Sequence, residues 1–206
     1  MKKILTAFLF AAFLTTPVAS AQSGIAVARA IGAMSGTQAD FVQKFTPRGF
    51  RNAQVESGAV VFGPSPQMRW TYAKPEKKTF VFNGTTSWFY VPSDRQVTVN
   101  QLTEKDRAEL PFLLLADSRS LAANYNVKES RKGDTVTTSL TSKSSGSMIR
   151  QISVTTSARD HMVRSLEYAD RQGNRTVFQF SGFRKAATDP AQFTFVAPAG
   201  VQVVRN

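Results

Sequence analysis

Apolar and polar residues alternate along most of the chain, and this period of two predicts β-strands. Turn signals such as Asn83-Gly84 and Pro92-Ser93-Asp94 separate the alternating segments, which recur about every 8–12 residues. The expected strands cover 41–45, 59–62, 68–72, 79–82, 87–91, 96–99, 126–130, 135–140, 149–154, 163–168, 176–180 and 193–195. Strands of this length and spacing are typical of an antiparallel meander.

Two parts of the chain depart from this period. Val27, Ile31 and Met34 recur at helical spacing, which predicts a short amphipathic helix that starts at Ser23 and ends at Gly36. Residues 104–123 are rich in helix formers, and Pro111 there suits a first helical turn, so we expect two short helices. One long twisted sheet with a helical insertion predicts a mainly β fold in which helices cover an apolar gap.

The first 21 residues form a separate unit. Two lysines precede the apolar run 4–14, and Ala19-Ser20-Ala21 is the small-x-small pattern of a cleavage site. The run is shorter than the roughly 20 apolar residues that a membrane-spanning helix needs. We therefore expect residues 1–21 to be a cleavable signal peptide and residues 22–206 to be a single exported domain. A buried N-terminal helix is the alternative.

Composition narrows the class of protein. The sequence has no cysteine, so it cannot be anchored through an acylated N-terminal cysteine as bacterial lipoproteins are, and we expect a soluble protein. The 26 Lys and Arg residues outnumber the 14 Asp and Glu residues, for a formal net charge of +12. This charge fits an anionic membrane surface, acidic proteins or no specific partner, whereas export argues against nucleic acid.

Groups for covalent or metal chemistry are scarce. His161 is the single histidine, and it lies at an expected turn where a surface position is the ordinary interpretation. The sequence has no zinc or calcium ligand spacing, no phosphate-binding glycine loop and no nucleophile elbow. We therefore expect no metal, no cofactor and no enzymatic activity. An exported hydrolase that uses His161 is the alternative.

Aromatic residues make up 11% of the chain, and many fall at alternating strand positions. An ordinary β-core explains any one of them, but together they are typical of a curved sheet that holds an apolar ligand.

Six segments, taken in order, resemble a known family. They are 41–45; Met68-Arg-Trp-Thr-Tyr72 with Lys74-Pro75; Asn83-Gly84 with Ser87-Trp-Phe-Tyr-Val-Pro92; Leu110-Pro-Phe-Leu-Leu-Leu-Ala116 with Tyr125-x-Val127; Asp170-x-x-Gly173-Asn174; and Phe193-Thr-Phe195 with Pro198-x-Gly200-Val201-x-Val203. Each segment is short, but their order over residues 37–204 resembles that of LolA, the family of periplasmic carriers of outer-membrane lipoproteins.

This resemblance implies an incomplete antiparallel β-barrel, a strongly curved sheet with a lid of short helices over an apolar cavity. It also implies a periplasmic, monomeric carrier of acylated lipoproteins that does no covalent chemistry. Such a carrier takes its cargo from an inner-membrane ABC-type extractor and passes it to an outer-membrane acceptor. The resemblance places Phe112 and Leu115 in the lid. With the strand alternation, it places six aromatic residues in the lipid-binding cavity: Trp70, Tyr72, Phe80, Phe82, Trp88 and Tyr90.

The chain departs from the family pattern at one position. Family members often carry an arginine six positions before the tryptophan, and its hydrogen bond is thought to hold the lid shut. Counted back from Trp70, that position is Pro64, which has no backbone donor. Arg69 is near, but on a strand it faces away from Trp70. Either another residue holds the lid, or the lid is held more loosely.

Two further functions stay open on the same fold. One is the membrane acceptor of the same pathway, against which the missing cysteine argues. The other is a lipid-sensing or envelope-stress module that binds a regulator.

Overall fold

The computed structural model describes residues 24–119, 121–187 and 189–206. The expected signal peptide with its cleavage site, and Ser23 as the expected helix start, lie outside these residues. In the described part of the chain, no helix is both long enough and apolar enough to cross a bilayer.

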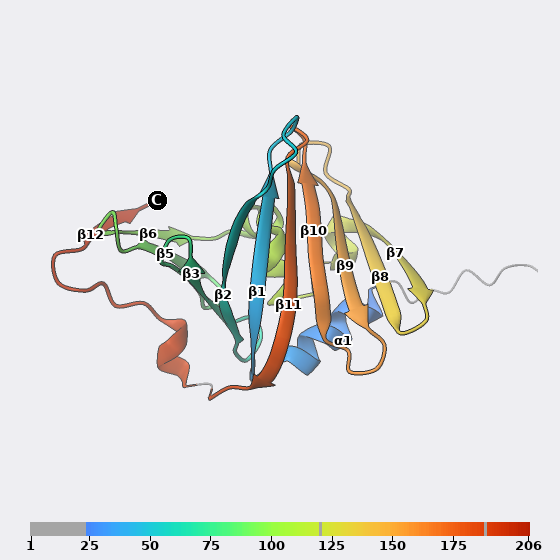
Figure 1. Cartoon of the computed structure of the whole chain (residues 1–206), viewed down its shortest axis with the longest axis horizontal. Helices are drawn as coiled ribbons and strands as arrows, with labels where there is room; N and C mark the ends of the chain where they lie inside the picture. The colour runs from blue at the N-terminus through green and yellow to red at the C-terminus, as the bar shows by residue number, and fades with distance from the viewer. Residues whose placement is uncertain (1–23, 120, 188) are drawn as a thin grey trace, which may run out of the picture.

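The described strands form one curved sheet (Figure 1). They are β1 (Thr37–Thr46), β2 (Gln54–Phe62), β3 (Met68–Lys74), β4 (Lys78–Phe82), β5 (Thr86–Val91), β6 (Gln96–Gln101), β7 (Tyr125–Lys132), β8 (Thr135–Ser142), β9 (Ile149–Ser157), β10 (Val163–Asp170), β11 (Arg175–Lys185) and β12 (Gln202–Arg205). Their order across the sheet is β12-β6-β5-β4-β3-β2-β1-β11-β10-β9-β8-β7, and the edge strands β7 and β12 do not pair with each other. Only the β12–β6 pair is parallel among these strands. The predicted incomplete antiparallel barrel is therefore confirmed.

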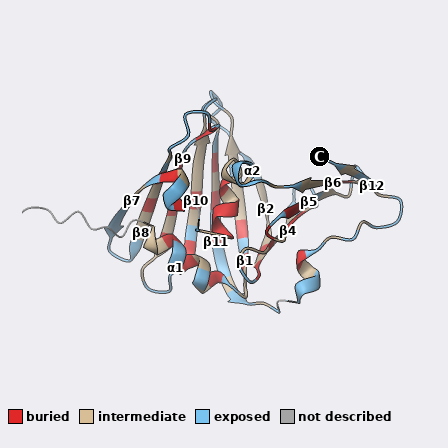
Figure 2. Ribbon diagram, turned by 180° about the vertical axis from the view of Figure 1, so that it is seen from behind, coloured by how far each residue is buried: buried red, intermediate tan, exposed pale blue. Residues whose placement is uncertain are grey.

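Short helices cover one face of this sheet, which we call the inner face; the opposite face is the outer face (Figure 2). The helices on the inner face are α1 (Ile25–Met34), α2 (Glu104–Ala108), η1 (Pro111–Leu115) and α3 (Leu121–Asn124), whereas η2 (Pro190–Phe193) lies on the outer face, where Gln192 O accepts a hydrogen bond from Arg69. Buried Val27, Ala30 and Met34 pack α1 against β8 and β9. Gly36 follows the helix with a positive φ of 73°, as its expected role at the helix end requires.

We call residues 104–116, which contain α2 and η1, the lid. Thr103 and Asp106 form a reciprocal capping box that starts α2, and Pro111 occupies the first turn of η1. With α3, the region 104–124 holds three short helices where two were expected.

The C-terminal region differs from the prediction. The expected strand 193–195 is wrong, because Phe193 ends the 3₁₀ helix η2, whose start is capped by Asp189 accepting a hydrogen bond from Ala191 N at 2.9 Å. The last strand is instead β12, beside β6. The fully buried ring of Phe193 packs closely over Gly63 at the end of β2, which leaves no space for a Cβ atom at that glycine.

Candidate functional site

An aromatic cluster fills the inner face of the sheet. At its centre lies Trp70, whose side chain is only 1% exposed. Its ring centroid lies 4.9 Å from that of Phe41, 5.3 Å from that of Phe178 and 5.9 Å from that of Phe180. The rings come from β1, β3 and β11, so the cluster joins the middle strands of the sheet into one apolar surface.

The lid adds its own apolar side chains to this cluster. The ring of Phe112 lies 5.7 Å from Trp70, 5.1 Å from Phe80 and 6.4 Å from Phe178. Leu115 is 2% exposed, and Leu113 and Leu114 are also buried. Phe112 and Leu115, the two residues expected in the lid, thus pack with Leu113 and Leu114 on the inner face.

Four of the six predicted cavity residues share the inner face. Trp70 pairs with Phe80 in the β3–β4 ladder and Met68 pairs with Phe82, and directly paired residues present their side chains on the same face. Tyr72 lies two residues beyond Trp70 on β3 and so faces the same side, and its hydroxyl donates a hydrogen bond to Gln43 Oε1 at 2.9 Å. Burial, with a smaller effect of Glu56, raises the pKa of Tyr72, so this residue is a neutral hydrogen-bonded phenol.

Trp88 and Tyr90 lie on the outer face, which corrects the expectation that they share a face with Trp70. The β4–β5 register pairs Val81 with Trp88, and Phe80 with Phe89. Alternation shows that Trp88 and Tyr90 share a face with each other, but it does not specify which face that is. Tyr90 packs on the outer face against Phe195 of the C-terminal segment, with ring centroids 5.0 Å apart.

Phe89, which sequence reasoning missed, is the aromatic residue that β5 contributes to the inner face. It continues the row Trp70–Phe80 across the sheet and is 38% exposed. The row thus runs from the buried cluster to an accessible apolar side chain. The expected turn at Asn83-Gly84 carried the signal for this placement, because a two-residue turn pairs Phe80 with Ser87 and so puts Phe89 on the face of Phe80. The observed loop, in which Asn83 accepts hydrogen bonds from Thr85 N and Thr86 N, shifts the pairing by two residues and keeps that face.

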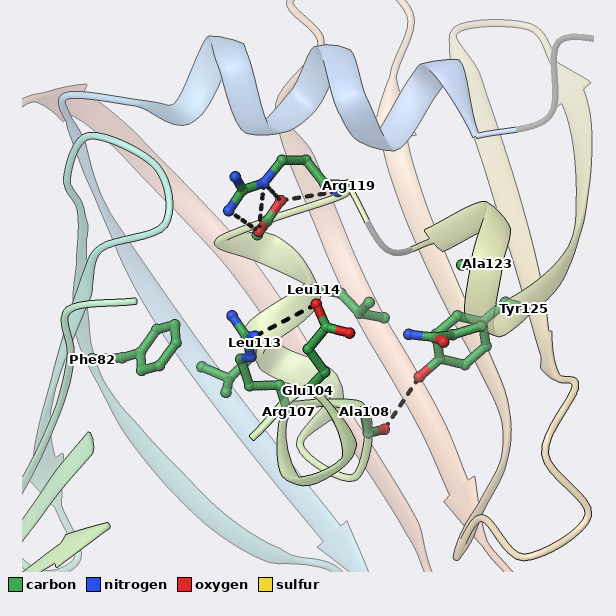
Figure 3. Close-up of a pocket in the computed structure, with 11 residues that line it drawn as sticks. Phe82, Glu104, Arg107, Ala108, Leu113, Leu114, Arg119, Ala123 and Tyr125 are labelled. Carbon is green, nitrogen blue, oxygen red and sulfur yellow. Dashed lines mark hydrogen bonds and ion pairs between the residues drawn. The ribbon is translucent and has the colours of Figure 1, made fainter. Parts of the chain in front are cut away.

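A cavity of about 390 Å³ lies beside the lid (Figure 3). Its lining mixes apolar and charged side chains: Phe82, Glu104, Arg107, Ala108, Leu113, Leu114, Asp117, Arg119, Ala123, Asn124 and Tyr125. Of the predicted cavity residues, only Phe82 reaches it. The fully apolar part of the inner face is instead occupied by the side chains of the lid, so an apolar ligand could enter there only if the lid moved.

Hydrogen bonds fix the lid to its surroundings at both ends. The hydroxyl of Ser65, in the loop between β2 and β3, donates to the carbonyl of Ala116 directly after η1 at 2.6 Å. At the other end, Tyr125 donates from its hydroxyl to Ala108 O at 3.2 Å, and Arg107 donates to Gly84 O at 3.3 Å. Ser65 directly follows Pro64, so a neighbouring hydroxyl reaches the lid where the family pattern places an arginine.

The remaining predicted residues lie away from the lid. Arg69 donates to Gln192 O at 3.2 Å on the outer face, as strand alternation requires. His161 is exposed in the turn between β9 and β10. In the parts of the chain that the structure describes, no three His, Asp or Glu side chains are grouped as metal ligands would be.

The geometry defines a class of protein: an open, strongly curved β-sheet whose apolar inner face is closed by short helices. The family described as "Outer membrane lipoprotein carrier protein LolA" matches residues 33–196, and the chain belongs to this family.

Individual relatives agree with this assignment. An outer-membrane lipoprotein carrier protein of Pectobacterium carotovorum is 29% identical over 204 residues, which cover 98% of this chain and 97% of that protein. One of Klebsiella pneumoniae is 30% identical over 172 residues, covering 82% and 81%. A solved structure of an uncharacterized conserved protein from Thermus thermophilus shares the fold, with a TM-score of 0.56, 16% identity and coverage of 88% and 98%.

Proposed function

We propose that residues 22–206 form one carrier domain, a periplasmic chaperone that binds the acyl chains of lipoproteins released from the inner membrane and delivers them to an outer-membrane acceptor. The observation that carries this proposal is the lid, whose buried apolar side chains occupy the aromatic inner face. Relatives that match over almost the whole chain are named as lipoprotein carriers, which supports the same role.

The energetics of the lid suit reversible binding. Withdrawing Phe112, Leu113, Leu114 and Leu115 from the inner face would expose four large side chains, at about 1.5–3 kcal/mol each, or about 6–12 kcal/mol in all. Burying a chain of roughly 16 carbons returns on the order of 12 kcal/mol. Because the two terms are of similar size, an acyl chain can replace the lid, and the lid can replace the chain at release.

This role needs no covalent chemistry, and the proposal is of a monomeric carrier without catalytic activity. Its partners are an inner-membrane ABC-type extractor that loads it and an outer-membrane acceptor that empties it. The aromatic row Trp70, Phe80 and Phe89 is the proposed binding surface, together with Tyr72 and Phe82.

The test is release of lipoprotein from spheroplasts. Purified mature protein is added to spheroplasts that make an acylated lipoprotein or the same protein with its acylated cysteine replaced. The proposal predicts that the added protein increases release of the acylated form only. Equal effects on both forms, or none on the acylated one, would refute it.

A further inference from the structure

The loop between β1 and β2, residues 47–53, projects from one end of the sheet (top of Figure 1). At its tip, Phe50 is 69% exposed, although aromatic side chains of this size are normally covered. Two exposed arginines, Arg48 and Arg51, flank it. We call residues 48–51 the basic tip.

The basic tip is held in place by the neighbouring loop. Arg48 N donates to Asn174 Oδ1 at 3.0 Å, and Phe50 N donates to Pro47 O at 3.1 Å. The aliphatic stem of Arg48 packs over Gly173, where a Cβ atom would lie 3.1 Å from Arg48 Cδ. The exposed ring is therefore presented by a hydrogen-bonded turn on a fixed support.

A second exposed apolar side chain belongs to the same end of the sheet. Arg171 joins the β10–β11 turn to the β8–β9 loop, donating from its backbone N to Met148 O at 2.8 Å and from Nε to Ser147 O at 2.6 Å. Met148 is 48% exposed. Three loops thus form one connected end that carries Phe50, Met148 and several arginines.

The positive charge of the basic tip is uncompensated. Over residues 24–119, 121–187 and 189–206, neither Arg48 nor Arg51 takes part in an ion pair. The carboxylates near this end are engaged elsewhere: Asp170 accepts from Asn174 N at 2.9 Å, Glu167 pairs with Arg175, and Glu109 accepts from Met148 N at 2.9 Å. An anionic partner would therefore meet no competing carboxylate at either guanidinium.

We propose that the basic tip docks on an anionic phospholipid surface, with the ring of Phe50 inserted among the headgroups and Arg48 and Arg51 on the lipid phosphates. An apolar ring beside basic residues is the usual chemistry of interfacial anchoring. A stable protein interface would need about 1,000 Å² or more of complementary surface. Inserting a single ring into the headgroup region requires no such area.

The test uses the full mature chain and vesicles of phosphatidylcholine with or without phosphatidylglycerol, in co-sedimentation at low and high salt. The wild-type protein should bind the anionic vesicles, and salt should weaken this binding. The double variant Arg48→Gln/Arg51→Gln should bind about 25-fold more weakly, at about fivefold for each arginine. Phe50→Ser should weaken binding on the order of tenfold or more.

Matched control variants distinguish an effect of the basic tip from the effect of removing any exposed positive charge or any exposed apolar side chain. Lys128→Gln/Lys132→Gln removes two exposed charges from the edge strand β7, and Val196→Ser removes an exposed apolar side chain from the C-terminal segment. Both should bind vesicles as the wild type does. Equal losses of vesicle binding in the controls and in the tip variants would overturn the proposal, as would a wild-type protein that does not bind anionic vesicles. Binding to immobilised polyglutamate but not to vesicles would assign the tip to an acidic protein instead.

The proposal extends the carrier function without depending on it. The vesicles contain no lipoprotein, so the two experiments are independent. Loss of vesicle binding with normal lipoprotein release would refute the docking proposal alone, and loss of release with normal vesicle binding would refute the carrier function alone. In a carrier that loads and unloads at two membranes, such a contact would orient the β1–β2 end of the sheet toward the bilayer.

Discussion

The hydrogen bond from Ser65 to the lid gives the sharpest prediction for lid movement. Ser65→Ala removes the donor that contacts Ala116 O at 2.6 Å and alters no side chain of the apolar inner face. Ser65 is exposed, so water can reach the freed carbonyl, and the loss is the net value of one hydrogen bond, about 1 kcal/mol. That value shifts the equilibrium between open and closed lid about fivefold toward the open form.

This shift should appear as tighter ligand binding. When the closed form predominates, the apparent dissociation constant is the intrinsic one divided by the open fraction. A fluorescent fatty-acid probe should therefore bind Ser65→Ala about fivefold more tightly, and amides of residues 112–116 should exchange with deuterium faster by a similar factor.

Two variants control the experiment. Ser65→Thr keeps a hydroxyl at the same place and should behave as the wild type. Ser181→Ala removes an exposed hydroxyl from the outer face of β11, across the sheet from the lid, and should change nothing. If Ser65→Ala left both the probe affinity and the exchange of the lid amides unaltered, this hydrogen bond would not hold the lid.

Three further predictions concern the inner face. Phe89→Glu places a carboxylate on the aromatic row of the inner face and should weaken probe binding at least tenfold, whereas Val203→Glu should not; an unchanged affinity in Phe89→Glu would contradict the binding surface. Phe80→Ala should weaken probe binding and Tyr90→Ala should not, because their rings lie on opposite faces; equal effects in the titration would contradict this assignment. Since the pKa of Tyr72 is raised by burial, the folded protein keeps a proton that the unfolded chain loses above about pH 10. The free energy of unfolding, measured by urea titration, should therefore fall as the pH rises past this value, and less steeply in Tyr72→Phe; parallel slopes would argue against it.

Local patterns in the sequence were sufficient to predict most strands. Alternation in β3 and β4 predicts the shared face of Trp70 and Phe80, because each strand gathers its large aromatic side chains on one side. The early helix is likewise visible in the spacing of Val27, Ile31 and Met34. These elements are determined by residues near one another in the chain, which is why a pattern read along the chain finds them.

The wrong predictions concern segments whose structure depends on contacts with distant parts of the chain. In β5 both faces are apolar, because the C-terminal segment covers the outer one, so alternation within this strand could not assign Trp88, and the strand pairing that follows from the Asn83-Gly84 turn was needed. Phe193-Thr-Phe195 has the alternation of a strand, but Asp189 and Pro190 start a 3₁₀ helix there and Phe193 is buried against Gly63. Local capping and a distant contact outweigh the two-residue period at that position.

The lid contact of Ser65 carried no sequence signal. A serine between two prolines is typical of a turn, and the carbonyl that accepts its hydrogen bond lies 51 residues away in the chain. The family pattern directs attention to Pro64, one residue earlier, which cannot donate. Only the folded arrangement of the β2–β3 loop beside η1 brings the hydroxyl to Ala116.

The carrier function is tested most directly by what the protein holds when it is taken from the periplasm. The mature chain, purified under mild conditions, can be examined by mass spectrometry for bound proteins and their lipid modifications. The account predicts that acylated lipoproteins accompany the protein and that Phe89→Glu, on the binding surface, reduces their amount. Recovery of unacylated proteins alone, or of the same acylated proteins at undiminished levels with Phe89→Glu, would contradict it.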